Sequence, residues 1–388
     1  MPPPLLSASR QIARAVLGVS AGVSLAFGVI AGGCASTTAT TASESSVRDR
    51  LADAAVDTEA WRELGYRLDW HVVPFVADGQ RIREVRGDQD IVAVQETGST
   101  ITVYDTATGR ALLTNQLATP LSRYVGIERV GDRLYIVGNS DISIVNLEQG
   151  TLDTRVDAGV ITTGRPVLMG DSLVMCGQEG DVVSVLPLPS PGFELWRFGV
   201  RDPINIDPVQ VGGVVVVASR SGNIVMLSGS DGAVVGRDRI FEGPGAQLAA
   251  GDGVAVVASL DRSIYAYDPV DGQRIWRFLT TRPLRSTPAI VQGTVIITTA
   301  DRGLIGINTA TGDLKWSKPD EVGEVVAEID GRALISDGSS LRLVDPDDGS
   351  VIASAQVDGI ASIEQATDSE ALYIISESNT VARLVPSR

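Results

Sequence analysis

The sequence predicts an all-β protein built from repeated four-stranded units. Three observations lead to this fold class: a recurring turn, many short segments rich in Val and Ile, and the loss of helical periodicity after Tyr66. The turn is complete in residues 267–276 and again in residues 307–316. There a strand ends in Asp or Asn, a Gly follows four residues later, and a Trp follows after four more. The Asx side chain can bond backbone N–H groups two residues on, and Gly takes the positive φ of the reversal.

The spacing of this turn predicts the architecture. Its glycines are Gly109, Gly150, Gly192, Gly232, Gly272, Gly312 and Gly349. The intervals between them are 41, 42, 40, 40, 40 and 37 residues. A period near 40 with several short strands per repeat is typical of a β-propeller, in which each repeat is one four-stranded blade. In one repeat we expect strands at residues 246–250, 254–259, 263–268 and 273–280.

The two ends of the repeat region, residues 66–388, predict eight blades. After Gly349 the last strands are expected at residues 371–376 and 380–385, and no outer strand follows them. Residues 66–73 form an expected strand that precedes the first complete repeat. If this strand supplies the missing outer one, the ring closes and leaves no exposed edge. A seven-bladed ring is the alternative, but it would leave one set of strands unused.

Residues 46–65 are expected to form a short amphipathic helix that docks on the propeller. Helical spacing relates Val47, Leu51, Ala54, Thr58 and Trp61. Ser46 is placed to cap this helix and Gly65 to end it. Residues 34–45 are small and polar, as expected of a flexible tether.

Residues 1–33 are expected to be a signal peptide. Arg10 and Arg14 precede an uncharged run at residues 15–33, and Cys34 follows directly. The residues before Cys34 resemble the lipobox of bacterial lipoproteins, although Ala31 stands where Leu is usual. That resemblance implies cleavage before Cys34 and lipid modification of this cysteine, with palmitate as one of the attached groups. The alternative is an uncleaved membrane anchor, because 19 apolar residues approach spanning length. Both interpretations place the propeller on the extracytoplasmic side of a cell membrane or outer membrane.

Charge and cysteine content restrict the function. The formal net charge is -16, and without residues 1–33 the chain keeps 30 Lys and Arg against 48 Asp and Glu, or about -18. Such a surface repels phosphate backbones, which argues against nucleic acid as a partner. After processing, Cys34 and Cys176 cannot form a disulfide framework.

The repeat resembles that of pyrroloquinoline-quinone (PQQ) enzymes and their relatives without cofactor. The pairs Gly192/Trp196, Gly272/Trp276 and Gly312/Trp316 carry the resemblance best. With the lipobox, the chain is similar to the BamB-type envelope lipoproteins, eight-bladed propellers that serve as scaffolds in outer-membrane protein assembly. The resemblance implies the fold more specifically than the function.

Nothing in the sequence predicts catalysis, a metal site or a cofactor. The quinoprotein family uses a pair of adjacent cysteines, whereas Cys176 stands alone in an expected inner strand and is better explained as a buried, inert thiol. His71 lies in the closing strand, and no His/Cys cluster has metal-ligand spacing. Asp345, Asp347 and Asp348 occupy a blade turn, so turn chemistry explains them without calcium. The repeat tryptophans are expected to pack between blades.

Six arginines form the candidate binding site. In an antiparallel blade, the second-to-third-strand turns and the connections between blades share one face. By this rule one sector carries Arg201, Arg220, Arg262, Arg282, Arg285 and Arg302. Arginine favours bidentate contacts to carboxylate and phosphate. The alternative is local pairing with the adjacent Asp202, Asp261 and Asp301.

The sequence therefore favours a non-catalytic, membrane-anchored lipoprotein scaffold that binds other cell-envelope proteins through its loops. Outer-membrane protein assembly follows from the resemblance alone. The first alternative is a binding protein for an anionic envelope ligand, such as a lipid or glycan, at the mouth of the propeller channel. A PQQ-dependent dehydrogenase is the second.

Overall fold

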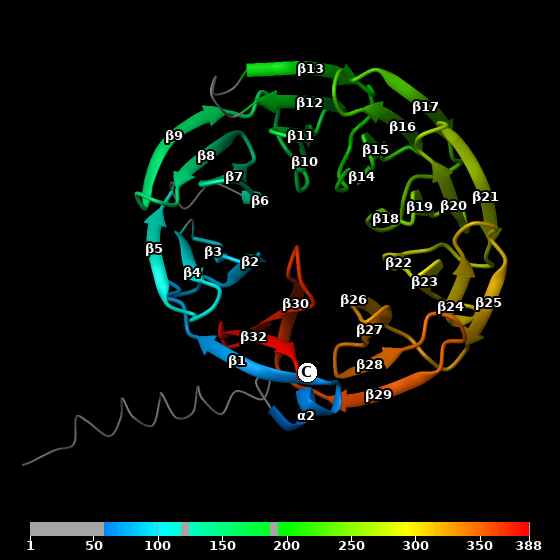
Figure 1. Ribbon diagram of the computed structural model, residues 1–388. Coiled ribbons are helices and arrows are strands. Elements are labelled where there is room, and N and C mark those ends of the chain that lie inside the picture. Colours follow the sequence, from blue (N-terminus) through cyan, green and yellow to red (C-terminus); the bar gives the residue numbers. More distant parts are fainter. Residues whose placement is uncertain (1–57, 99, 118–123, 187–192, 388) are drawn as a thin grey trace, which may run out of the picture. The chain divides into compact units, whose positions relative to one another are not determined.

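The computed structural model describes residues 58–98, 100–117, 124–186 and 193–387. In this range the chain forms the predicted propeller of eight four-stranded antiparallel sheets, each of which is one blade (Figure 1). Consecutive strands of a blade are hydrogen-bonded neighbours and run from the inside of the ring outward. The expected signal peptide, tether and first part of the helix lie outside the described residues.

Blades 1 to 4 follow one another along the chain. Blade 1 is β2 (Ile82–Gly87), β3 (Ile91–Glu96), β4 (Thr100–Asp105) and β5 (Ala111–Gln116). Blade 2 is β6 (Tyr124–Val130), β7 (Arg133–Gly138), β8 (Asp141–Asn146) and β9 (Thr151–Asp157). Blade 3 is β10 (Val167–Met169), β11 (Ser172–Cys176), β12 (Asp181–Leu186) and β13 (Phe193–Gly199). Blade 4 is β14 (Val209–Val211), β15 (Val214–Ala218), β16 (Asn223–Ser228) and β17 (Val234–Arg239).

Blades 5 to 8 complete the ring. Blade 5 is β18 (Ala249–Gly251), β19 (Val254–Ala258), β20 (Ser263–Asp268) and β21 (Gln273–Leu279). Blade 6 is β22 (Ala289–Val291), β23 (Thr294–Thr299), β24 (Gly303–Asn308) and β25 (Leu314–Lys318). Blade 7 is β26 (Glu324–Ile329), β27 (Arg332–Ser336), β28 (Ser340–Val344) and β29 (Val351–Gln356). Blade 8 is β30 (Ile360–Gln365), β31 (Leu372–Ser376), β32 (Val381–Pro386) and β1 (Tyr66–Val72).

The strand β1 closes the ring, as predicted. It pairs antiparallel with the C-terminal strand β32, from Tyr66 opposite Pro386 to Val72 opposite Val381. Blade 8 therefore takes its outer strand from one end of the propeller sequence and its other three from the opposite end (Figure 1).

Strand boundaries differ from the sequence-based ones mainly at the inner edge. In blade 5 the innermost strand covers only Ala249–Gly251, not residues 246–250. The residues before it leave the regular ladder, because Gly245 N donates to Ala258 O at 2.9 Å and Pro244 forms an isolated bridge with Ser259. The other expected strands of blades 5 and 8 agree with the structure to within one residue at each end.

The core lies between the blades. Among the described residues, each of eight apolar clusters joins two neighbouring sheets. The helix α2 (Thr58–Glu63) contributes to the cluster of blades 7 and 8 with Ala60 and the fully buried Trp61. Gly65 follows this helix at φ 83°, and Ala60 and Trp61 pack against the propeller.

Four tryptophans each connect one blade to the recurring turn of the next. Trp276 in β21 donates from Nε1 to Thr309 O at 2.7 Å, in the turn of blade 6. A Cβ atom at Gly312 would lie only 2.7 Å from Trp276 Cγ. The turn therefore needs glycine at this position to leave room for the indole ring of Trp276. Equivalent bonds join Trp196 to Gly229 O, Trp316 to Pro346 O and, from the closing strand, Trp70 to Thr106 O. The predicted packing role of the repeat tryptophans is confirmed.

Candidate partner-binding surface

The six candidate arginines lie on the face that carries the second-to-third-strand turns and the connections between blades. These elements share a face because every blade is an antiparallel meander. The arginine surface, as we call the six, consists of Arg201 after β13, Arg220 between β15 and β16, Arg262 between β19 and β20, Arg282 and Arg285 between β21 and β22, and Arg302 between β23 and β24. Its role in binding stays a prediction.

The arginine surface is exposed and largely without ion pairs. All six residues are exposed to solvent. Among the described residues, only Arg302 of the six has a carboxylate within 4.0 Å, with its Nε 3.9 Å from Asp301 Oδ2. Its guanidinium carbon also lies 5.7 Å from the ring centroid of Phe278. The arginine surface can therefore offer several guanidinium groups to an acceptor outside the described chain.

The neighbouring aspartates are occupied by other hydrogen bonds. Asp261 Oδ2 accepts from Tyr265 OH at 2.7 Å and from Phe241 N at 3.3 Å. Asp202 Oδ2 accepts from Ser221 N at 2.9 Å and from its Oγ at 2.6 Å. Burial opposes ionisation of Asp202, yet these hydrogen bonds hold its pKa below the ordinary value. These carboxylates fix the connections between blades. Local Arg–Asp pairing was the alternative interpretation of the sequence. Arg302 does pair with its neighbouring aspartate, whereas Arg262 does not.

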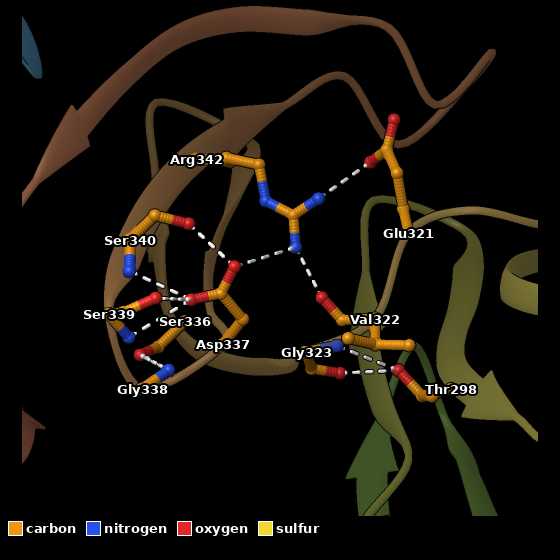
Figure 2. Close-up of polar contacts among 10 residues, drawn as sticks. All are labelled: Thr298, Glu321, Val322, Gly323, Ser336, Asp337, Gly338, Ser339, Ser340 and Arg342. Carbon is orange, nitrogen blue, oxygen red and sulfur yellow. Dashed lines mark hydrogen bonds and ion pairs between the residues drawn. The ribbon is translucent and has the colours of Figure 1, made fainter.

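A cleft lies beside the arginine surface, between blades 6 and 7. It has a volume of about 460 Å³, and its lining includes Val322, Glu324 and Asp337. Asp337 accepts hydrogen bonds from the backbone and hydroxyl groups of Ser339 and Ser340, which lower its pKa (Figure 2). An Asp followed by small polar residues in a turn does indicate such a network, but the sequence does not indicate the cleft beside it.

The wall of the cleft is fixed by an arginine that is not part of the arginine surface. Arg342 in β28 places Nη1 3.0 Å from Glu321 Oε2, and Nη2 3.9 Å from Asp337 Oδ2 (Figure 2). The same guanidinium donates to Val322 O. This network holds the short connection between blades 6 and 7 against blade 7. One guanidinium thus pairs with both Asp337 and Glu321 and offsets part of the acidic charge beside the cleft.

A second group of charges lies on the inner strands of blades 1, 2 and 8 and on the connection before β10. The inner-strand charge cluster consists of Glu84, Arg86, Glu128, Arg165 and Glu364. Arg165 Nε lies 3.8 Å from Glu84 Oε1, and its Nη2 lies 3.6 Å from Glu364 Oε1. Burial raises the pKa of Glu84 to about 7 although Arg165 opposes this shift. The sequence could not predict this cluster because its members come from separate repeats, blades 1, 2 and 8 and the connection before β10.

Cys176 and His71 occupy the expected strands. Cys176 ends β11, is fully buried, and has a thiol pKa raised by that burial, as expected for an inert side chain. His71 is half-buried in β1. In the part of the chain that the structure describes, no three His, Cys, Asp or Glu residues are grouped as metal ligands.

Within the described ranges, none of the helices has the length and apolar character needed to cross a membrane.

Comparison with known families agrees with this architecture. The model of the family described as outer membrane protein assembly factor BamB matches residues 138–235 and 220–385, which is more than half of the chain. The chain belongs to the BamB family.

Members of this family in three organisms show limited identity to the chain. The BamB protein of Burkholderia pseudomallei is 30% identical over 117 residues, or 29% of each chain. That of Nitrosomonas eutropha is 24% identical over 188 residues, 46% of this chain and 44% of the relative. That of Bordetella pertussis is 27% identical over 156 residues, 39% of this chain and 40% of the relative. The aligned part of the chain thus spans less than half the length of each of these three relatives.

Two crystal structures share the fold. BamB from Moraxella catarrhalis aligns with a TM-score of 0.61 at 15% identity, over 81% of this chain and 97% of that one. The computationally designed Ika8 protein aligns with a TM-score of 0.63 at 14% identity, over 78% of this chain and 96% of that one. A designed protein aligns as well as a family member, so these likenesses bear on the fold and not on function.

Proposed function

We propose that this protein is a non-catalytic scaffold in the assembly of outer-membrane proteins and that it binds other envelope proteins. The observation that carries the proposal is the family match over residues 138–385. A rigid ring supports such a role because its blades hold many independent loops in fixed positions. The loops of one face are further fixed by hydrogen bonds from backbone N–H groups to carboxylates, such as the bond that Phe241 N donates to Asp261.

The proposal includes a lipid anchor at Cys34 that tethers the ring to the extracytoplasmic side of a membrane. Cys34 lies outside the described residues, so its support is the charged, apolar and small-residue pattern of residues 1–33. The strand β1 begins at Tyr66, which leaves a stretch of chain between Cys34 and the ring.

The proposed contact to a partner is the arginine surface. Five of its six guanidinium groups have no carboxylate of the described chain within 4.0 Å. Such groups favour a partner that supplies its own carboxylates, and opposite potentials raise the rate and specificity of association. The chain as a whole is acidic, with a net charge of -16, so six exposed arginines in one sector stand out against that background.

Crosslinking in the native cell tests the scaffold and its surface together. The full chain and the double variant Arg262→Glu, Arg302→Glu are crosslinked, and the recovered envelope proteins are identified and quantified. We expect components of the outer-membrane assembly machinery with the natural chain and at least a tenfold loss with the variant.

The matched control reverses two exposed arginines on the opposite face, Arg110 after β4 and Arg332 at the start of β27, and should retain the partners. Recovery of no assembly component with the natural chain contradicts the scaffold. Equal recovery with both double variants contradicts the role of the arginine surface in binding but leaves the scaffold proposal in place.

A further inference from the structure

Phe241 is an exposed aromatic residue in the middle of the arginine surface. It lies in the connection between β17 and β18 and is 87% exposed. Its backbone N–H is bonded to Asp261, the residue before Arg262, at 3.3 Å. On the other side of the same turn, Leu279 is 63% exposed and Thr280 N donates to Arg262 O at 2.9 Å. Two exposed apolar side chains therefore flank the turn of Arg262.

Arg262 has a backbone conformation that favours glycine. Its φ is 68°, in the left-handed region. Gly180 and Gly222 occupy the equivalent turn positions of blades 3 and 4 at φ 94° and 92°. All three accept the same bond from the following connection: Gly180 O from Val200 N, Gly222 O from Ile240 N, and Arg262 O from Thr280 N. Blade 5 thus carries a strained arginine where blades 3 and 4 have glycine.

The fold itself gives no reason for that arginine. In the described part of the chain no carboxylate lies within 4.0 Å of the Arg262 guanidinium, so the strain is not offset by a local ion pair. Strain of this kind in a native structure is a recognised indicator of a functional position. An exposed aromatic side chain beside an arginine is also the composition that is enriched at the energetic centres of protein interfaces.

We propose that Phe241 and Arg262 are the anchor of a binding site for an acidic protein segment that carries an exposed apolar side chain. The partner's apolar side chain packs on Phe241 and Leu279, and its carboxylates bind Arg262 and its arginine neighbours. This inference deepens the proposed function and rests on it, because it names the chemistry of the scaffold's partner.

The charge pattern favours a protein segment over a membrane surface. Asp202, Glu242 and Asp301 lie among the arginines of the same face, and an anionic lipid layer would meet them as well. A segment of defined sequence can place its carboxylates opposite the arginines and avoid these acids. Among the described residues, the exposed apolar side chains that flank the turn of Arg262 are Phe241 and Leu279, an area that suits a short segment better than insertion into lipid.

A library of random twelve-residue peptides displayed on phage provides the probe. Peptides selected on the full chain are synthesised, and their affinities for variants are measured by fluorescence anisotropy. We expect selected sequences to contain Phe, Leu or Trp flanked by Asp and Glu. Phe241→Ala should weaken their binding at least tenfold, as for a central interface residue. Arg262→Gly should weaken it similarly while the thermal unfolding midpoint stays the same or rises, because glycine relieves the left-handed strain.

The controls separate a specific site from a generally adhesive face. Phe75, which is 77% exposed, lies on the same face in the connection between β1 and β2, away from the arginines. Val270, 68% exposed, lies in the outer turn of the same blade on the opposite face. Phe75→Ala and Val270→Ala should each change affinity by less than twofold. Equal losses with Phe75→Ala and Phe241→Ala overturn the proposal, as does unchanged binding by Arg262→Gly.

Three further outcomes also decide against the proposed partner. They are selected peptides without acidic residues, equal binding to phosphatidylglycerol vesicles, and a Phe241-dependent dimer of the chain in sedimentation experiments. Failure of this site is distinguishable from failure of the proposed function. A Phe241→Ala chain that loses the peptides but still crosslinks to the assembly machinery overturns only the anchor. A chain that binds the peptides but crosslinks to no assembly component overturns only the scaffold.

Discussion

At the scale of single residues, Glu84 has a carboxyl group whose pKa lies near neutral pH. It lies on the innermost strand of blade 1 and is only 4% exposed. The charges that face it are Arg165 and Arg86, which favour the ionised carboxylate, and Glu364 and Glu128, which disfavour it. Burial is the largest effect and raises the pKa from 4.5 to about 7. The folded protein therefore binds a proton at Glu84 more tightly than the unfolded chain does.

The pKa of Glu84 predicts how stability depends on pH. Its stabilising contribution is complete below about pH 4.5, where both states are protonated, and is lost as the pH rises through 7. Glu84→Gln keeps the size of the side chain and removes the titration. We expect the free energy of unfolding of the natural chain to fall by about 3 kcal/mol relative to Glu84→Gln between pH 4.5 and pH 8.

Urea unfolding at several pH values measures this difference. Glu148→Gln, in an exposed turn of blade 2, serves as the control and should follow the natural chain. Parallel pH profiles for the natural chain and Glu84→Gln would show that the inner-strand charge cluster does not shift the titration of Glu84.

At the scale of elements, the outer turn of a blade can be both a reversal of the chain and a contact to the preceding blade. In blade 6, Asn308 Oδ1 accepts from Ala310 N and Thr311 N, both at 3.0 Å. Gly312 then takes φ 77° and leaves room for Trp276 of blade 5. Glycine is thus required for two separate reasons: the left-handed backbone and the close approach of the indole ring.

Two alanine substitutions separate these two reasons. Gly253, in the turn between β18 and β19, has φ 79° but no neighbouring atom within 4 Å of an added Cβ. Gly253→Ala should therefore cost only the left-handed strain, about 1 kcal/mol in the free energy of unfolding. Gly312→Ala should cost an additional 1–3 kcal/mol, roughly the penalty of overpacking against Trp276. Chemical denaturation measures both, and equal losses would mean that the indole moves aside freely.

The sequence predicted elements well wherever the repeat itself carries the signal. The turn period indicated eight blades, and the unmatched strand at residues 66–73 indicated how the ring closes; both predictions are confirmed. Positions that depend on contacts between distant repeats were not predictable. Trp70 was not recognised as a member of the tryptophan series because no complete turn precedes it in the sequence. The left-handed φ of Arg262 was missed because an arginine gives no such signal.

At the scale of the whole molecule, closure of the ring depends on β1. This strand supplies the outer edge of blade 8, and Trp70 within it donates to Thr106 O of blade 1 at 2.8 Å. Without β1, the strand β32 would expose its backbone groups, and blade 1 would lose its contact to the tryptophan of the preceding blade. An unpaired strand edge is a template for association with another chain.

A series of three truncations isolates this contribution. Removal of residues 1–57 keeps α2 and β1, removal of residues 1–65 keeps β1 alone, and removal of residues 1–72 takes both. Loss of α2 takes the buried Trp61 from the core and should cost about 3–5 kcal/mol, as for a large core truncation. Loss of β1 adds an open edge, so only the shortest chain should associate as its concentration rises.

Sedimentation velocity and thermal unfolding of the three chains provide the measurements. We expect the first two to be monomeric, with the lower unfolding midpoint in the second, and the third to form concentration-dependent oligomers. Association reports on the exposed β32 edge, whereas the midpoint of the second chain reports on the helix, so the two effects separate. A monomeric third chain with the midpoint of the second would mean that seven complete blades hold the eighth without its outer strand. Closure by β1 would then not be a condition for a stable ring.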